Sequence, residues 1–212
     1  MNTKLISRQS DHLLIFFTWW WCDDNQFINH YYSWDLLLCR DYSNLDFDWD
    51  FSQYKDINLL AYSAWVFVAS LLKDILPNIN NKIAINWNPM MFDDYFGIDK
   101  KWLNLMKNLS ESNCMDFIKS FLLFDDADFE NFITTPSLRS FDSSKNEAAC
   151  LENFSKKRYT PMIFDKVLLS DNDNLFYPHT QQEYFKDYKI IRDAAHHTPF
   201  LKYRSLDNLI NL

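Results

Sequence analysis

Six short, almost wholly apolar runs constrain the fold of this 212-residue chain more than any other feature of its sequence. Such runs, rich in Ile, Leu, Val and Phe, are typical of strands that are buried on both faces of a parallel sheet. The six runs are His12–Phe17, Asp35–Cys39, Ile57–Tyr62, Lys82–Asn86, Lys166–Ser170 and Tyr188–Arg192. The pattern also predicts helices at Ser63–Leu76, Trp102–Leu109, Cys114–Phe124, Asn146–Phe154, Gln181–Lys186 and Leu206–Leu212. This alternation of strands and helices predicts an α/β fold with a doubly wound, mostly parallel sheet.

The middle of the chain interrupts this alternation. Residues 99–157 carry helix signals and no convincing strand. We therefore expect one domain over residues 1–212, with residues 99–157 forming a helical insertion over the ends of the strands. Long insertions at that place commonly act as lids or as walls of a binding site.

Charge and cysteine content exclude several classes of protein. The net charge of −8 argues against a nucleic-acid partner, although Lys100-Lys101 and Lys156-Lys157-Arg158 are local basic groups. The longest apolar run, Leu13–Cys22, is about half a membrane span and lacks a signal-peptide cleavage site. We therefore expect a cytoplasmic protein with no membrane partner. The four cysteines are far apart and form no C-x-x-C pair, which predicts reduced thiols and no metal site.

A serine stands where a buried strand is predicted to end and a buried helix to begin. Ser63 occupies this junction, with Ala61 two residues before it and Trp65 two residues after it. The position matches the nucleophile elbow, G-x-S-x-G, of α/β-hydrolases, in which small residues let the strand and the helix approach closely. Ala61 suits this pattern and Trp65 does not. The alternative interpretation of Ser63 is an ordinary helix N-cap.

Two later segments supply the other groups that serine catalysis needs. Asp171–Pro178 follows the strand predicted at Lys166–Ser170, and Ala194–Phe200, with His196 and His197, follows the last predicted strand. This is the order of a catalytic triad in that fold. The hydroxyl attacks, an imidazole takes its proton, and a carboxylate orients the imidazole. Alternatively, the carboxylate is a helix cap and the histidines are surface residues.

Several segments, in order, match the patterns of one family. The pairs are Leu13–Trp21 with LILFFAGWG, Asp41-Tyr42 and Leu45–Asp50 with DY…LNFDFD, Ala61–Val66 with AWSLGV, Ala84–Trp87 with AINGT, Asp93–Ile98 with DDxFGI, Asp173–Pro178 with DKIFxP, and His197–Phe200 with H-x-P-F. In these segments the chain resembles the pimeloyl-[acyl-carrier-protein] methyl ester esterases of biotin synthesis, in their short form with a reduced lid. The resemblance covers most of the chain and depends on the order and spacing of the motifs. It implies an α/β-hydrolase fold.

The resemblance also implies roles for individual residues. It makes Ser63 the nucleophile, Asp173 the acid and His197 the base, with His196 as the alternative base. The oxyanion donors would be the backbone N–H groups of Trp20 and Ala64. Asp171 would be a neighbour that caps the loop.

Four tryptophans depart from the family patterns, and each falls on a family glycine. They are Trp19, Trp21, Trp65 and Trp87, in a chain with eight Trp and one glycine, Gly97. Average usage of roughly 7% would give about fifteen glycines. We hypothesise that the gene encodes glycine with UGA at these four codons and that UGA has been translated as Trp. UGG at all four would refute this; deliberate substitution is the alternative, and part of the glycine deficit stays unexplained. We expect Trp65 to overpack the turn, at a cost of about 1–3 kcal/mol, and to displace Ser63.

The function that the resemblance implies is hydrolysis of the methyl ester of pimeloyl-acyl-carrier protein by a monomeric serine esterase that needs no metal or organic cofactor. Its partner would be acyl carrier protein, which is acidic. The candidate docking residues are Lys100, Lys101, Lys107, Lys119, Lys156, Lys157 and Arg158, whose alternative interpretation is ordinary solvated charge. The rival functions are another carboxylesterase or thioesterase of this fold and a catalytically impaired, α/β-hydrolase-like binding protein.

Overall fold

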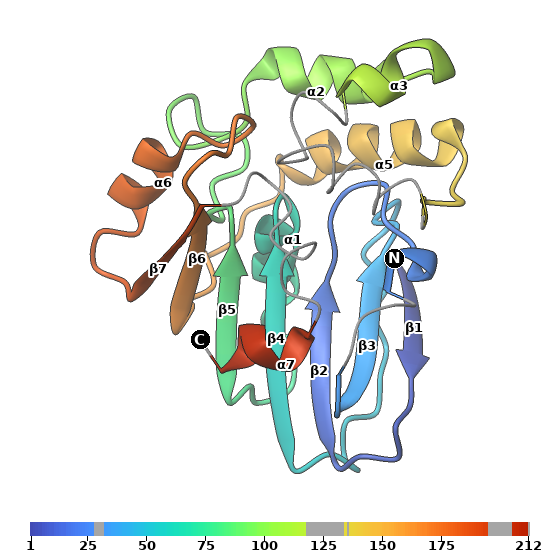
Figure 1. Ribbon diagram of the computed structural model, residues 1–212, viewed down its shortest axis with the longest axis vertical. Coiled ribbons are helices and arrows are strands. Elements are labelled where there is room, and N and C mark those ends of the chain that lie inside the picture. The colour runs from blue at the N-terminus through green and yellow to red at the C-terminus, as the bar shows by residue number, and fades with distance from the viewer. Residues whose placement is uncertain (28–31, 118–133, 135, 195–204, 212) are drawn as a thin grey trace.

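A seven-stranded sheet forms the centre of the computed structural model, which describes all residues except 28–31, 118–133, 135, 195–204 and 212 (Figure 1). The strand order is β1-β3-β2-β4-β5-β6-β7. β1 pairs antiparallel with β3, and all other neighbouring strands are parallel. The strands are β1 Asn2–Ile6, β2 His12–Phe17, β3 Asp35–Arg40, β4 Asp56–Tyr62, β5 Asn81–Ile85, β6 Lys166–Ser170 and β7 Ile190–Asp193. The predicted α/β class is therefore confirmed.

The apolar runs form strands because both faces of the sheet are covered. In β2, Leu13, Ile15 and Phe17 enter one buried cluster with helix α1 (Trp65–Leu72). Leu14 and Phe16 enter a second cluster on the opposite face, with helix α7 (Leu206–Ile210). Figure 1 shows α1 and α7 on opposite sides of the central strands. This two-sided burial is the reason that the runs are continuous instead of alternating with polar residues.

One strand was missed by the sequence pattern. β1, with the sequence NTKLI, mixes polar and apolar residues, because it is an antiparallel edge strand with exposed and half-buried positions. The other six strands agree with the predicted runs to within two residues at each end, and β2 and β6 agree at both ends.

The helices differ from prediction mainly at their ends. α1 is shorter than the predicted Ser63–Leu76 but is buried, with all but one of its residues inaccessible, as expected. Side-chain caps from Asp99 and Ser140 start α2 (Lys100–Lys107) and α5 (Phe141–Phe154) earlier than the apolar pattern indicated. α3 covers Glu111–Phe117, and the rest of that predicted helix lies outside the described residues. α6 is Pro178–Tyr184, and a 3-10 helix, η1, covers Asp24–Phe27.

The helices of the middle segment lie beyond the carboxyl ends of the parallel strands, as Figure 1 shows for α2, α3 and α5. Within the described part of residues 99–157, all regular structure is helical. The four cysteines lie apart as free thiols, and Cys22, Cys39 and Cys114 are buried. Among the described residues no helix is both long and apolar enough to cross a bilayer.

Candidate active site

Ser63 lies at the turn between β4 and α1 with its backbone in the left-handed region, at φ 59°. Its N–H donates to the carbonyl of Ile85 on the neighbouring strand (2.9 Å), and its carbonyl accepts from Val66 N–H (3.1 Å). The N-cap of α1 is Ala64, so the interpretation of Ser63 as an N-cap is wrong. A left-handed serine between a central strand and a helix is the backbone feature of a nucleophile elbow.

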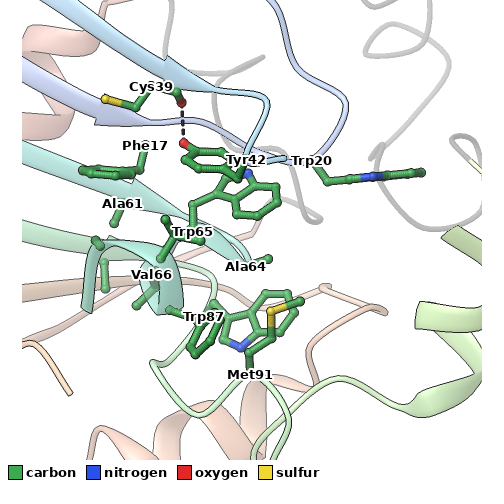
Figure 2. Close-up of a cluster of buried hydrophobic side chains, with 14 of the residues drawn as sticks. Phe17, Trp20, Cys39, Tyr42, Ala61, Ala64, Trp65, Val66, Trp87 and Met91 are labelled. Carbon is green, nitrogen blue, oxygen red and sulfur yellow. Dashed lines mark hydrogen bonds between the residues drawn. The ribbon is translucent and has the colours of Figure 1, made fainter. Parts of the chain in front are cut away.

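Ser63 keeps this conformation with the bulky Trp65 in place. The Trp65 indole is fully buried and stacks on the ring of Tyr42, with ring centroids 4.2 Å apart and the planes inclined by 26°. The Tyr42 hydroxyl in turn donates to the carbonyl of Cys39 (Figure 2). The core above β4 therefore accommodates the indole by aromatic stacking.

A small apolar cavity opens at Ser63. Its volume is about 20 Å³, and it is lined by Trp19, Trp20, Ser63, Ala64, Trp87, Ile98, Met106, Phe117 and Leu175. The structure thus brings the expected nucleophile and both expected oxyanion residues to one cavity. Neither Trp20 N–H nor Ala64 N–H donates a backbone hydrogen bond within the described residues. Both groups are therefore compatible with binding an oxyanion.

Asp173 is buried, with 4% of its surface exposed, in the turn that follows β6. Its Oδ1 accepts from the N–H groups of Leu175 (2.8 Å) and Phe176 (3.0 Å). Leu175 lines the cavity at Ser63. The pKa of Tyr62, adjacent to Ser63, is raised well above its ordinary value, first by burial and then by the negative charge of Asp173. The charge of this carboxylate therefore acts on the end of β4.

The two histidines, His196 and His197, lie outside the described residues, as does Lys119. The structure describes the chain up to Ala194, where it leaves β7. Asp193, the last residue of β7, pairs with Ser170 at the end of β6, so the described chain ends at the same edge of the sheet as the Asp173 turn. Asp171 forms an exposed ion pair with Arg192 at 2.5 Å, which fastens this turn to β7.

A polar clip that the sequence reasoning missed joins β5 to β6 under this turn. Asn86 Nδ2 donates to Ser170 Oγ, and Ser170 N–H donates to Asn86 Oδ1, both at 2.8 Å. Asn86 also has a positive φ of 58°. An asparagine directly after a strand is a weak signal for such a position, because Asn tolerates the left-handed region.

The helical insertion is fastened to the loop that carries Trp20. The indole N–H groups of Trp20 and Trp21 donate to the carbonyls of Ser144 (2.8 Å) and Arg139 (3.0 Å). Arg139 is itself paired with Glu147 (2.5 Å) and with Asp41 (3.1 Å). This buried ion cluster was also missed by sequence reasoning, because Asp41 is far from Arg139 and Glu147 in the chain.

The three lysines of α2 are each paired with an acidic residue. Lys100 pairs with Asp94 (3.4 Å), Lys101 with Asp99 (3.2 Å) and Lys107 with Glu152. These exposed pairs favour the interpretation of the three lysines as solvated surface charge. Among the described residues no group of three His, Cys, Asp or Glu side chains is placed to hold a metal ion.

Comparison with known proteins gives a consistent family assignment. Residues 1–208 match the family model of pimeloyl-ACP methyl esterase BioG. An uncharacterized protein of Haemophilus influenzae is 31% identical over 192 residues, which is 87% of each chain. A malonyl-[acyl-carrier protein] O-methyltransferase of Bacteroides fragilis is 29% identical over 195 residues, which is 87% of this chain and 39% of that protein.

Solved structures agree with this assignment. The crystal structure of BioG from Haemophilus influenzae superposes with a TM-score of 0.88 at 28% identity and covers 99% of this chain and 100% of that one. An esterase from Exiguobacterium antarcticum superposes with a TM-score of 0.65 at 11% identity over 99% of this chain and 92% of that one, which shows the shared α/β-hydrolase fold.

Proposed function

Because the chain belongs to the pimeloyl-ACP methyl esterase BioG family, we propose that it hydrolyses the methyl ester of a pimeloyl group carried on acyl carrier protein, in biotin synthesis. Family membership and the esterase fold support the coarser assignment, a carboxylic ester hydrolase acting on an ester linked to a carrier protein. The single observation that carries the proposal is the left-handed turn of Ser63 at the end of β4, beside the apolar cavity.

In the proposed mechanism Ser63 Oγ attacks the ester carbonyl while His197, or His196 as the alternative, takes its proton. Asp173 orients and stabilises the resulting imidazolium. The N–H groups of Trp20 and Ala64 bind the oxyanion. The protonated histidine then gives its proton to the departing methoxide, which leaves as methanol. Water attacks the acyl-enzyme in a second cycle and releases the free carboxylate, so no metal or organic cofactor is required.

The same proposal includes a lid and a docking partner. The segment 99–157 acts as the lid of a single domain, and its described helices α2, α3 and α5, beyond the carboxyl ends of the strands, support this role. Acyl carrier protein, which is acidic, docks next to the lid on a monomer. Lys156, Lys157 and Arg158 at the end of α5 are better placed for this contact than Lys100, Lys101 and Lys107, which have acidic neighbours of their own.

The decisive experiment is covalent labelling with a fluorophosphonate probe, followed by peptide mapping. It is done on the chain as written and on a variant with Trp19, Trp21, Trp65 and Trp87 all changed to Gly. We expect labelling at Ser63, its loss in Ser63→Ala and its retention in Ser112→Ala, a matched control at an exposed serine. Absence of labelling in both chains would support the non-catalytic alternative.

Substrate choice is tested by comparing methanol release from the pimeloyl-carrier methyl ester with turnover of short p-nitrophenyl esters. We expect the carrier-linked ester to be preferred and the four-site Trp→Gly variant to rescue a biotin auxotroph. Efficient turnover of p-nitrophenyl esters alone, without rescue, would favour a different esterase or thioesterase of this fold.

A further inference from the structure

We propose that this fold uses glycine at positions 19, 21, 65 and 87, and that the Trp19 and Trp87 indoles occupy the space in which the substrate's acyl chain would lie. The second half of this proposal rests on the proposed function. The first half rests on three observations that do not depend on activity: the backbone conformation at position 21, the buried polar atoms at positions 65 and 87, and the ring packing at position 87. Position 19 enters through the cavity that its indole lines.

The backbone of Trp21 supports glycine directly. Its φ is 62°, in the left-handed region, where a bulky side chain is a genuine outlier. Glycine adopts that region without the steric conflict, because it has no Cβ. The segment around Trp21 cannot relax freely, since Cys22 N–H donates to the carbonyl of Trp19 (3.2 Å) and the Trp21 indole is held by Arg139.

The buried indoles of Trp65 and Trp87 carry a second signature. Both side chains are almost fully buried, at 0% and 1% exposure, and neither Nε1–H has a hydrogen-bond partner in the part of the chain that the structure describes. Tryptophans that belong to a core usually satisfy this donor. Three other tryptophans here do so: Trp49 Nε1 donates to Thr3 Oγ1 (2.9 Å), Trp20 to the carbonyl of Ser144 and Trp21 to the carbonyl of Arg139. This signature therefore applies to positions 65 and 87 and not to position 21.

Ring packing at Trp87 is a third signature. The Trp87 and Phe176 ring centroids are 3.2 Å apart, whereas aromatic pairs normally pack at about 4.5–7 Å. The Trp87 indole is 1% exposed and belongs to the buried cluster that also holds Met91, which lies beside it in Figure 2. The site is therefore overfilled by the indole and not merely lined by it.

These indoles determine the size of the cavity at Ser63. At about 20 Å³ the cavity holds about one water molecule, while pockets for small-molecule ligands are typically about 300–1,000 Å³. Without the Trp19 and Trp87 side chains, the walls that remain beyond Ser63 include Ile98, Met106, Phe117 and Leu175. Such a wall is apolar, and it suits an unbranched chain of methylene groups extending from an ester at Ser63.

The remaining glycine shows that the fold needs this residue. A Cβ at Gly97 would lie 2.5 Å from the carbonyl oxygens of both Asp93 and Met91, so a side chain is excluded there. Reading of UGA as glycine in the gene would explain why the other four positions are written as Trp. Deliberate substitution would leave UGG at the same codons, so the codons and the natural protein distinguish the two origins.

The experiment measures thermal unfolding of the single variants Trp21→Gly, Trp65→Gly and Trp87→Gly and of the four-site variant that also carries Trp19→Gly. The matched control is Trp49→Gly. We expect the midpoint to be unchanged or raised in the single variants and raised in the four-site variant. Trp49→Gly should lower it, because its indole is satisfied. Losses at positions 65 and 87 as large as that of Trp49→Gly would overturn the proposal.

Two further readouts complete the test. Peptide mass spectrometry of the protein isolated from its natural source should show glycine at all four positions, and tryptophan there would refute the glycine assignment. In the combined variant, the preference for a p-nitrophenyl heptanoate over the acetate should rise about ten-fold or more, since each methylene gains an apolar contact. An unchanged preference in an active variant would overturn the pocket assignment. A stabilised variant that hydrolyses no ester would instead contradict the proposed function and leave the glycine assignment supported.

Discussion

The rings of Trp87 and Phe176 lie with centroids 3.2 Å apart at an interplanar angle of 41°, and the N–H of Phe176 donates to Asp173 Oδ1 at 3.0 Å. The overfilled ring pair therefore acts directly on the turn that carries the proposed catalytic acid. Packing at position 87 and the placement of Asp173 are linked through a single residue.

This link predicts that the effect of Phe176→Leu depends on residue 87. With Trp87 present, the smaller side chain relieves the ring conflict, and the free energy of unfolding should rise by about 1 kcal/mol. With Trp87→Gly, the same change removes a useful contact and should lower it by about 1 kcal/mol. Urea unfolding of the four proteins in a double-mutant cycle gives the coupling, which should be about 2 kcal/mol. Additive effects would show that the two rings do not compete for space.

The strained turn at Ser63 predicts that Ser63→Gly is more stable than Ser63→Ala. Both variants lose the hydroxyl, but only glycine removes the Cβ that makes a φ of 59° unfavourable. The difference in the free energy of unfolding should be about 1 kcal/mol in favour of glycine, measured by urea unfolding at pH 7. Equal stability of the two variants would mean that the backbone at Ser63 is not held in the left-handed region.

Asp173 predicts a separation of stability from activity. Asp173→Asn keeps an oxygen that can accept from Leu175 and Phe176 N–H, so the free energy of unfolding should change by less than about 1 kcal/mol. The amide cannot stabilise an imidazolium, so ester hydrolysis by the four-site Trp→Gly variant should fall by about 10²–10⁴-fold. Asp173→Ala, the matched comparison, should lose both stability and ester hydrolysis. Full activity in Asp173→Asn would assign the acid elsewhere.

Glu147 predicts a pH dependence of stability. Burial raises its pKa from 4.5 to about 7, against the lowering effect of Arg139. Because the folded protein binds this proton more tightly than the unfolded chain, the contribution is complete below pH 4.5 and is lost as the pH rises through 7. The stability lost between pH 4.5 and pH 7 amounts in total to about 3 kcal/mol.

The test is thermal or urea unfolding between pH 5 and pH 8, for the parent and for Glu147→Gln, which cannot titrate. The parent should lose stability relative to this variant as the pH rises. Glu152→Gln is a control at an exposed acid whose partner, Lys107, lies on α2. Parallel curves for the parent and Glu147→Gln would show that Glu147 stays ionised beside Arg139 throughout this range.

Much of the fold could be predicted because its signals are local. A run such as Lys166–Ser170 is buried on both faces wherever it is placed in a parallel sheet, so its composition alone indicates a strand. β1 could not be found in this way, because an edge strand with polar positions resembles a loop. Helix starts were misjudged where a cap, not the apolar pattern, sets the first residue, as Ser140 does for α5.

For the candidate site, the sequence by itself determined that Ser63 follows a buried strand and that an acidic turn follows a later one. The sequence also has tryptophan at positions where the family patterns have glycine. Only the tertiary structure decided what those tryptophans do: which indoles are buried without a hydrogen-bond partner among the described residues, which overlaps Phe176 and which fill the cavity. The same holds for the pairing of Arg139 with Glu147 and Asp41 and for the Asn86–Ser170 clip. Apart from Arg139 and Glu147, these residues are distant from their partners in the chain. The energies of all these contacts depend on burial and distance, which no local pattern of residues specifies.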